Sequence, residues 1–181
     1  MKQDYRISEI VFSKEALEKR IKELAQWVNE TYKDSSELII VGLLKGSIPF
    51  LAQLIKDITV DHKLDFMIAS SYAGGHKSTG NVKVIMDLAE EICDKDVLIV
   101  EDIIDSGITL DKITKMLSLR KPKSLKILTL LDKPDNRKVD LVADNYGFIA
   151  PNEFLVGFGL DYKEILRNIP YIGVMDKKYI K

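Results

Sequence analysis

The sequence contains one cysteine, Cys93, which excludes an internal disulfide and a metal centre built from cysteine thiolates. The formal net charge is −1, so the chain lacks the excess of positive charge that attracts nucleic acids. No apolar run approaches the length of a membrane span, and the first residues lack the apolar core of a signal peptide. We therefore expect a cytoplasmic protein with neither nucleic acid nor membrane as a partner.

Two common nucleotide-binding motifs are also missing. A P-loop requires its lysine to follow the second glycine, whereas in residues 42–47 Lys45 precedes that glycine. No Gly-x-Gly-x-x-Gly pattern follows a predicted strand, which excludes the dinucleotide-binding fingerprint. Any phosphate site in this chain must therefore be built in another way.

The composition is that of a globular protein, because 46% of the 181 residues are hydrophobic and 30% are charged. This length suits one domain with a full core. Apolar runs of strand length alternate with amphipathic segments, which indicates an α/β fold with a doubly wound parallel sheet flanked by helices. The predicted helices are 13–32, 48–58 and 110–119, and the predicted strands are 37–44, 63–72, 82–87, 97–100 and 124–131.

The chain is organised around residues 97–109, Val-Leu-Ile-Val-Glu-Asp-Ile-Ile-Asp-Ser-Gly-Ile-Thr. The four apolar residues predict a strand buried on both faces. Three carboxylates, Glu101, Asp102 and Asp105, then follow, and a Ser-Gly turn precedes an amphipathic helix. The N–H groups of such a turn can bind a phosphate, and carboxylates at a strand end can hold Mg²⁺ or sugar hydroxyls.

A simpler interpretation makes Asp105 and Ser106 helix caps and leaves Glu101 and Asp102 as solvated charges. Capping explains one of these residues well. It does not explain two consecutive acids directly after four buried apolar residues, where burial of charge is costly. The pattern therefore favours a phosphate and metal site.

Residues 101–109 resemble the phosphoribosyl-diphosphate motif of type I phosphoribosyltransferases, in the form found in the hypoxanthine/guanine branch of that family. The one departure is Ser106, where many relatives carry threonine, and the hydroxyl is kept. The resemblance extends from about residue 36 to residue 174. It implies that Asp105 is the general base. It also implies that the ribose and 5′-phosphate are bound by Glu101, Asp102, Asp105, Ser106, Gly107, Ile108 and Thr109.

The same resemblance assigns residues to the pyrophosphate and to a lid. Residues 44–47, Leu-Lys-Gly-Ser, match a pyrophosphate-binding loop in which the peptide before the lysine is often cis. The glycine-rich segment 73–81 matches a flexible lid over the active site, although a plain hairpin loop is the simpler interpretation. The residues implied are Lys45, Gly46 and Arg167 for pyrophosphate, and Ser71 and Tyr72 for the lid.

After residue 134 the pattern becomes turn-rich and strand-like, and it predicts a hood subdomain formed mainly by about 138–181 of a single domain. Phe154 would be ordinary core in such a run, but by resemblance its ring stacks on the purine. Lys133 matches a lysine that donates to the 6-oxo group, and Arg137 matches a basic residue of the base and pyrophosphate region. By resemblance the purine is bound by Lys133, Phe154, Leu155 and Asp161, and the metal by Glu101, Asp102 and Asp161.

The resemblance implies a Mg²⁺-dependent purine-salvage enzyme that joins hypoxanthine, and guanine, to phosphoribosyl diphosphate and works as a homodimer or homotetramer. Two other classes of protein were weighed. A non-catalytic nucleotide-sensing regulator on the same fold predicts a basic surface and lost catalytic residues, and the sequence has neither. A phospho-acceptor signalling domain also clusters acids on a doubly wound sheet, but it leaves the Ser-Gly-Ile-Thr turn and the hood unexplained.

Overall fold

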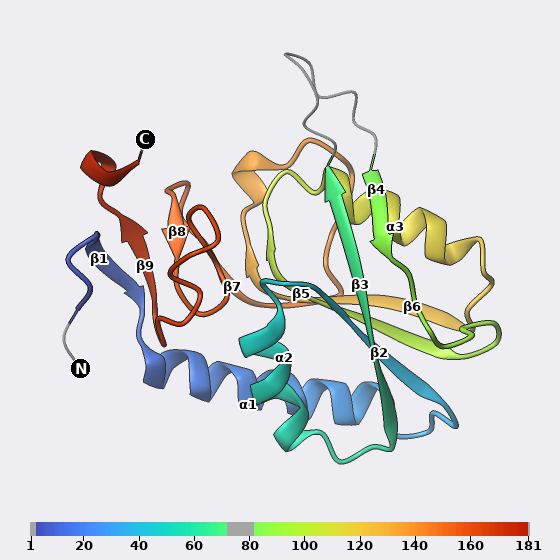
Figure 1. The fold of residues 1–181 in the computed structure, drawn as a ribbon. Helices are drawn as coiled ribbons and strands as arrows, with labels where there is room; N and C mark the ends of the chain where they lie inside the picture. Colours follow the sequence, from blue (N-terminus) through green and yellow to red (C-terminus); the bar gives the residue numbers. More distant parts are fainter. Residues whose placement is uncertain (1–2, 72–81, 181) are drawn as a thin grey trace.

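A six-stranded sheet forms the centre of the computed structural model, which describes residues 3–71 and 82–180. The strand order is β4-β3-β2-β5-β6-β7, and every pair of neighbours is parallel except the edge pair β3 and β4 (Figure 1). The predicted α/β fold with a mostly parallel sheet is therefore confirmed. The strands are β2 (Leu38–Leu43), β3 (His62–Ser71), β4 (Val82–Met86), β5 (Asp96–Ile104), β6 (Ser124–Asp132) and β7 (Asn145–Ile149).

Helices cover both faces of this sheet, which explains why its central strands are apolar without alternation. In β2, Leu38 and Ile40 pack into one core with α1 (Lys14–Thr31) and α2 (Ile48–Leu54). The intervening Ile39 and Val41 pack into a second core with α3 (Ile108–Ser118) on the opposite face (Figure 1). Successive side chains of one strand thus belong to different cores, as the period of two requires.

The helices begin and end close to the predicted positions. Ser13 caps α1, because its hydroxyl accepts a hydrogen bond from the N–H of Ala16 at 3.2 Å. The predicted helix 48–58 is shorter, since α2 ends at Leu54 and a 3-10 turn, Ile55–Asp57, completes it. Helix α3 begins at Ile108, two residues before the predicted start. No helix of the described part of the chain has the length and apolar content that crossing a bilayer requires.

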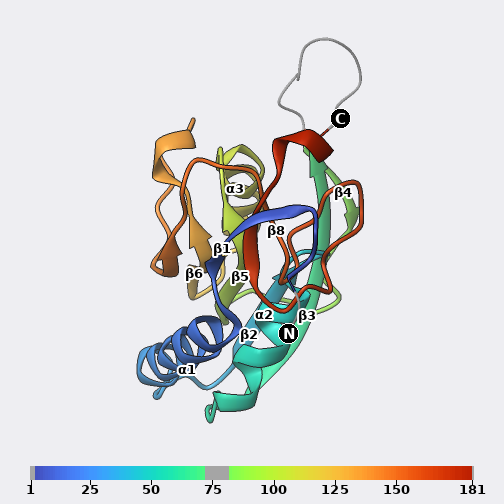
Figure 2. The same cartoon turned by 90° about the vertical axis from the view of Figure 1, so that its left-hand side faces the viewer.

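A second, three-stranded antiparallel sheet stands beside the large one, in the order β1-β9-β8. It consists of β1 (Ile7–Phe12), β8 (Leu155–Val156) and β9 (Ile172–Met175), and it faces the viewer in Figure 2. We call this sheet with the segment 157–171 the hood. The hood has a small core of its own, in which Ile7 packs with Val156 and Met175.

The hood differs from its prediction in two respects. Asn145–Ile149 was assigned to it but is β7 of the large sheet, where Tyr146 pairs with Thr129 and Phe148 with Leu131 of β6. Gly147 permits this pairing, because a Cβ there would collide with the carbonyl oxygen of Leu130. Conversely, β1 from the beginning of the chain was not predicted and supplies one edge of the hood. The predicted range of about 138–181 thus includes one strand of the large sheet, and the division into a domain and a hood subdomain stays a prediction.

Asp96 ties the large sheet together at the end remote from the carboxyl ends of its strands. Its carboxylate is buried and accepts hydrogen bonds from Ser35 Oγ at 2.6 Å, Ser124 Oγ at 2.7 Å and Lys123 Nζ at 3.0 Å. Burial acts to raise the pKa of Asp96, but these three donors outweigh it, so the pKa is lowered. The carboxylate therefore links β5 to the start of β6 and to the segment before β2.

We expect Asp96→Ala to lower the free energy of unfolding by roughly 1–3 kcal/mol, because three donors lose their acceptor. The deficit should shrink on acidification, since a group with a lowered pKa stabilises the fold fully above its unfolded pKa and loses that contribution as the pH falls through its folded pKa. Urea denaturation at several pH values measures both effects. Exposed Asp34→Ala is the control, and equal stability of the two variants at neutral pH would refute the role of Asp96.

Candidate active site

The central carboxylates lie within β5 rather than after it. The predicted strand ended at Val100, but β5 continues to Ile104 because β6 runs beside it, with Glu101 paired to Thr129 and Ile104 to Asp132. Glu101 and Asp102 are half-buried. The polar residues therefore occupy the carboxyl end of one of the two central strands of the sheet, where ligands of such sheets bind.

Asp105, Ser106 and Gly107 form the turn from β5 into α3. Gly107 has φ of +77°, a left-handed conformation that glycine adopts without strain. The N–H of Asp111 donates the first bond of the helix, to Gly107 O at 2.9 Å. The N–H groups of the residues before it, among them Ile108 and Thr109, have no acceptor within the helix and carry the positive end of its dipole. This turn suits the binding of a phosphate.

The Arg137 side chain packs against that turn. Its guanidinium pairs with buried Asp132 and donates to Leu141 O at 2.8 Å and Ile104 O at 3.4 Å. The stem lies so close to Gly107 that a Cβ there would stand 2.9 Å from Arg137 Cδ. The side chain is therefore engaged with the protein in this structure, and its place in the base and pyrophosphate region stays a prediction.

Glu101 and Asp102 carry an electrostatic cost. Burial, followed by the neighbouring charge of Asp102, raises the pKa of Glu101 well above its ordinary value. Burial raises the pKa of Asp102 to about 6, although the charge of Arg167 opposes the shift. A cation, or hydroxyl groups that donate to these oxygens, would relieve this cost.

This donor set fits Mg²⁺ held jointly by the protein and a substrate. Mg²⁺ in proteins is usually bound through one or two carboxylates together with substrate phosphates. Glu101 and Asp102 supply such a pair. Among the described residues no three His, Cys, Asp or Glu side chains are placed to hold a metal ion together. The predicted third ligand, Asp161, pairs with Arg167 at 2.9 Å, and its role toward a metal stays a prediction.

The loop after β2 is packed directly against Asp102. A Cβ at Gly46 would collide with Asp102 Oδ2, and a Cβ at Gly159 of the hood would collide with the carbonyl oxygen of Gly46. The Leu44–Lys45 peptide that precedes this contact is cis. Two glycines therefore allow the β2 loop, the β5 carboxylate and the hood to meet without intervening side chains.

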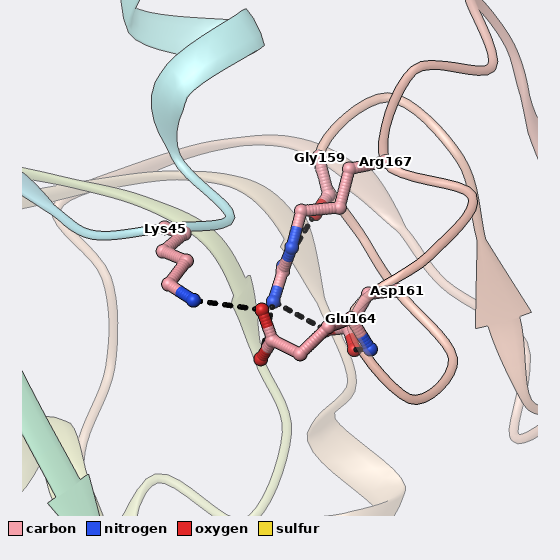
Figure 3. A network of polar contacts seen from close by, with 5 residues as sticks. All are labelled: Lys45, Gly159, Asp161, Glu164 and Arg167. Carbon is pink, nitrogen blue, oxygen red and sulfur yellow. Dashed lines mark hydrogen bonds and ion pairs between the residues drawn. The ribbon is translucent and has the colours of Figure 1, made fainter.

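A network of charges joins the same loop to the hood (Figure 3). Arg167 donates to Gly159 O at 2.8 Å and forms ion pairs with Asp161 at 2.9 Å and Glu164 at 3.2 Å. Glu164 also pairs with Lys45 at 2.8 Å. The two cations predicted to bind pyrophosphate are thus brought together, with a carboxylate between them.

A third group lies where β6 ends. Lys133 is buried, and its ammonium donates to Glu153 O at 3.1 Å and lies 4.0 Å from Asp105 Oδ1. The ammonium therefore has one backbone acceptor and a nearby carboxylate in the protein. Asn136 donates to Asp105 Oδ1 at 2.9 Å. Phe154 is 43% exposed and meets the Tyr162 ring edge-on, with centroids 5.8 Å apart.

The structure thus gathers most of the predicted residues at one edge of the large sheet, beneath the hood. Leu155 follows Phe154 as the first residue of β8 and is buried. Ser71 ends β3, while Tyr72 and the predicted lid 73–81 lie outside the described residues.

Three residues of the site escaped prediction from the sequence: Asn136, Asp132 and Glu164. Asp132 and Asn136 flank a Lys-Pro-Asp stretch that indicates only a turn after a strand. Glu164 stands among alternating charges in a segment that is typical of an exposed surface. Their positions beside Arg137, Asp105 and Lys45 emerge only from the tertiary structure.

Comparison with known proteins agrees with this geometry. Residues 8–163 match the phosphoribosyl transferase domain family. The chain is 51% identical over 166 residues to a hypoxanthine phosphoribosyltransferase of Salmonella typhimurium, with 91% of this chain and 93% of that protein covered. It is 49% identical over 175 residues to a hypoxanthine-guanine phosphoribosyltransferase of Bacillus subtilis, covering 97% and 96%. A crystal structure of a hypoxanthine phosphoribosyltransferase from Staphylococcus aureus superposes with a TM-score of 0.93 at 45% identity, covering 97% and 95%.

The raised pKa of Asp102 predicts that the ligand-free protein becomes less stable as the pH rises. An acid whose pKa is higher in the folded state than its unfolded value of 3.8 contributes most below that value and loses its contribution through about pH 6. Asp102→Asn should therefore raise the Tm at pH 7.5, by roughly 2–4 °C for each kcal/mol relieved, and leave it nearly unchanged at pH 4. Thermal unfolding in a chelator tests this, with exposed Asp61→Asn as the control. Parallel pH curves for the parent and Asp102→Asn would contradict the prediction.

Proposed function

The chain belongs to the phosphoribosyltransferase family, and we propose that it transfers the phosphoribosyl group of phosphoribosyl diphosphate to hypoxanthine, and to guanine, with release of diphosphate. The names of its relatives support this choice of substrates. The observation that carries the proposal is the meeting of a buried ammonium and a carboxylate, Lys133 and Asp105, 4.0 Å apart beside the phosphate-binding turn. The carboxyl ends of β5 and β6 then offer groups for a base, a sugar and its phosphates.

The phosphate turn and the β5 carboxylates would hold the sugar. Backbone N–H groups of residues 106–109 and the hydroxyls of Ser106 and Thr109 bind the 5′-phosphate, and the dipole of α3 favours its negative charge. Glu101 and Asp102 accept hydrogen bonds from the ribose hydroxyls. At this end of β5 the strand is paired with β6, at Glu101 and Ile103, which holds the carboxylates in place and orients the anomeric carbon toward the base.

Lys133 and Phe154 would select and hold the base. An ammonium can only donate hydrogen bonds, so Lys133 suits an oxygen at the 6 position of a purine. Glu153 O takes one of its donors and leaves the others for the ligand. The exposed ring of Phe154 offers a stacking surface, which the edge-on contact with Tyr162 orients.

Asp105 would accept the proton that leaves the imidazole ring of the purine as its nitrogen attacks the anomeric carbon. The hydrogen bond from Asn136 fixes the orientation of the carboxylate and leaves its second oxygen for the base. Lys45 and Arg167 bind the departing diphosphate. Mg²⁺, with Glu101 and Asp102 as its protein ligands, supplies charge stabilisation on the diphosphate when bound.

The regulator alternative is not favoured, because the carboxylates, the general-base candidate and the basic residues of the site are all present. Assembly into dimers or tetramers and a cytoplasmic location stay predictions. One assay tests the proposed activity itself. Release of diphosphate is measured with Mg²⁺, phosphoribosyl diphosphate and each of hypoxanthine, guanine, xanthine and adenine in turn.

We expect turnover of hypoxanthine and guanine and almost none of adenine, whose amino group donates toward the ammonium of Lys133. Sites built around such a polar contact reject analogues by roughly 10⁴-fold in good cases. Lys133→Met should therefore lower kcat/KM for hypoxanthine far more than for adenine. Lys126→Met, earlier on the same strand, is the control. Comparable kcat/KM for adenine and hypoxanthine in the parent protein would refute the role of Lys133.

Asp105→Asn should reduce kcat by roughly 10²–10⁴-fold while nucleotide binding is largely retained. The side-chain oxygen of asparagine can still accept the hydrogen bond from Asn136, so the geometry is kept and only the basic group is lost. Steady-state kinetics and calorimetric binding of the nucleotide separate the two effects. Asp135→Asn, which is exposed in the neighbouring turn, should behave as the parent. Unchanged kcat in Asp105→Asn would rule out general-base catalysis by this residue.

A further inference from the structure

Glu164 holds a position that nothing in the proposed mechanism uses. Its two carboxylate oxygens are divided between two cations, with Lys45 Nζ at 2.8 Å and Arg167 Nη2 at 3.2 Å (Figure 3). The cations come from separate parts of the fold, since Lys45 follows β2 and Arg167 belongs to the hood. Glu164 is therefore the anion that links the β2 loop to the hood.

The same two cations are those to which the proposed function assigns the diphosphate. Carboxylate and phosphate oxygens make the same kind of charge-assisted hydrogen bond with lysine and arginine. A diphosphate bound by Lys45 and Arg167 would therefore use the donors that Glu164 occupies. The carboxylate is a competitor that the protein itself supplies, at a short distance from the site and at high effective concentration.

The backbone presents this carboxylate in a tight turn. Lys163, Glu164 and Leu166 have φ of +51°, +68° and +76°, which are left-handed conformations that side chains other than glycine rarely adopt. The turn is closed by hydrogen bonds between Tyr162 and Ile165, both at 3.1 Å. A strained backbone at a residue that contacts a candidate site is the kind of feature that accompanies function.

The side chain is free to leave. The Glu164 side chain is 64% exposed and that of Lys45 is 60% exposed, so neither is held in place by packing. Exposed ion pairs are weak enough for a multiply charged ligand to replace. Hydrogen bonds from Lys45 and Arg167 lower the pKa of Glu164, so it remains an anion at neutral pH.

Arg167 also leaves one donor unpaired in this arrangement. Its Nε is buried, and among the residues that the structure describes no acceptor lies within hydrogen-bonding distance of it. A buried donor without a partner costs free energy. The guanidinium would gain from a shift that pairs all of its donors, and a diphosphate, with several oxygens, offers the acceptors for that.

We propose that Glu164 sets the affinity of the diphosphate subsite by competing with diphosphate for Lys45 and Arg167. The inference rests on the proposed function. In the absence of diphosphate, the carboxylate neutralises the two cations and keeps the β2 loop against the hood. Binding of diphosphate requires the carboxylate to leave both cations, so the affinity is lower than the cations alone would provide, and the product is released more readily.

The test compares Glu164→Gln with the parent in calorimetric titrations of inorganic diphosphate in excess Mg²⁺. The amide keeps the size and shape of the side chain but removes its charge, so we expect diphosphate to bind roughly three- to tenfold more tightly. The gain should shrink at about 0.5 M salt, because salt screens the charges of exposed groups. Inosine 5′-monophosphate, which has no diphosphate, should bind the two proteins within twofold of each other.

Two further variants serve as controls. Glu164→Asp keeps the charge at shorter reach and should bind diphosphate with an affinity between those of the parent and Glu164→Gln. Glu90→Gln removes a half-buried glutamate that pairs with Lys63 at 2.9 Å, away from the site, and should match the parent.

Weaker binding of diphosphate by Glu164→Gln would show that the carboxylate braces Lys45 and Arg167 for the ligand, and it would overturn the inference. Equal binding by the parent and Glu164→Gln would overturn it as well. In both cases the proposed function stands if the parent releases diphosphate from hypoxanthine and phosphoribosyl diphosphate. A parent that neither catalyses this reaction nor binds diphosphate overturns the proposed function and the inference together.

Discussion

Glu101 and Asp102 are consecutive carboxylates on a central strand of the sheet, and burial raises the pKa of both, with the charge of Asp102 raising that of Glu101 further. Other residues of the site reduce this electrostatic cost or approach the same groups. The positive charge of Arg167 opposes the rise in the pKa of Asp102, and Gly46 lets the β2 loop approach the Asp102 carboxylate. A ligand that brings hydroxyl groups or a cation relieves the remaining repulsion. The ligand-free site therefore contains negative charge that the protein itself does not fully neutralise.

The sequence predicted the structure correctly wherever a local pattern of residues determines it. The apolar runs of β2 and β5 required cover on both faces, and the structure supplies it with helices on either side. Prediction failed where a neighbouring strand of the folded protein determines the length or the pairing of an element. The strand β5 runs on through its two acids because β6 offers hydrogen-bond partners as far as Asp132. Likewise β7 joins the large sheet because Gly147 can approach Leu130, a relation that no periodicity displays.

The site shows the same division between local and tertiary information. The motif of residues 101–109 predicts the position of the candidate phosphate-binding turn directly, because the N–H groups of that turn lie on consecutive residues. The pairing of Glu164 with Lys45 does not, since it needs left-handed backbone at Lys163, Glu164 and Leu166, none of which is glycine. Charged residues in a polar segment are usually solvated. Glu164 pairs with Lys45 because the fold places the hood beside the β2 loop.

The strand order β1-β9-β8 has a consequence for how the molecule is made. Among the described strands of the hood, β1 pairs with β9 alone, so β1 must wait until a strand much later in the sequence has been made. Such distant pairing is slow to form, whereas the nearest-neighbour βαβ units of the large sheet can assemble earlier. A nascent chain would therefore contain the turn from β5 into α3 well before it contains Phe154 and Arg167. The two sides of the candidate site would come together only after β9 has been made and the hood has formed.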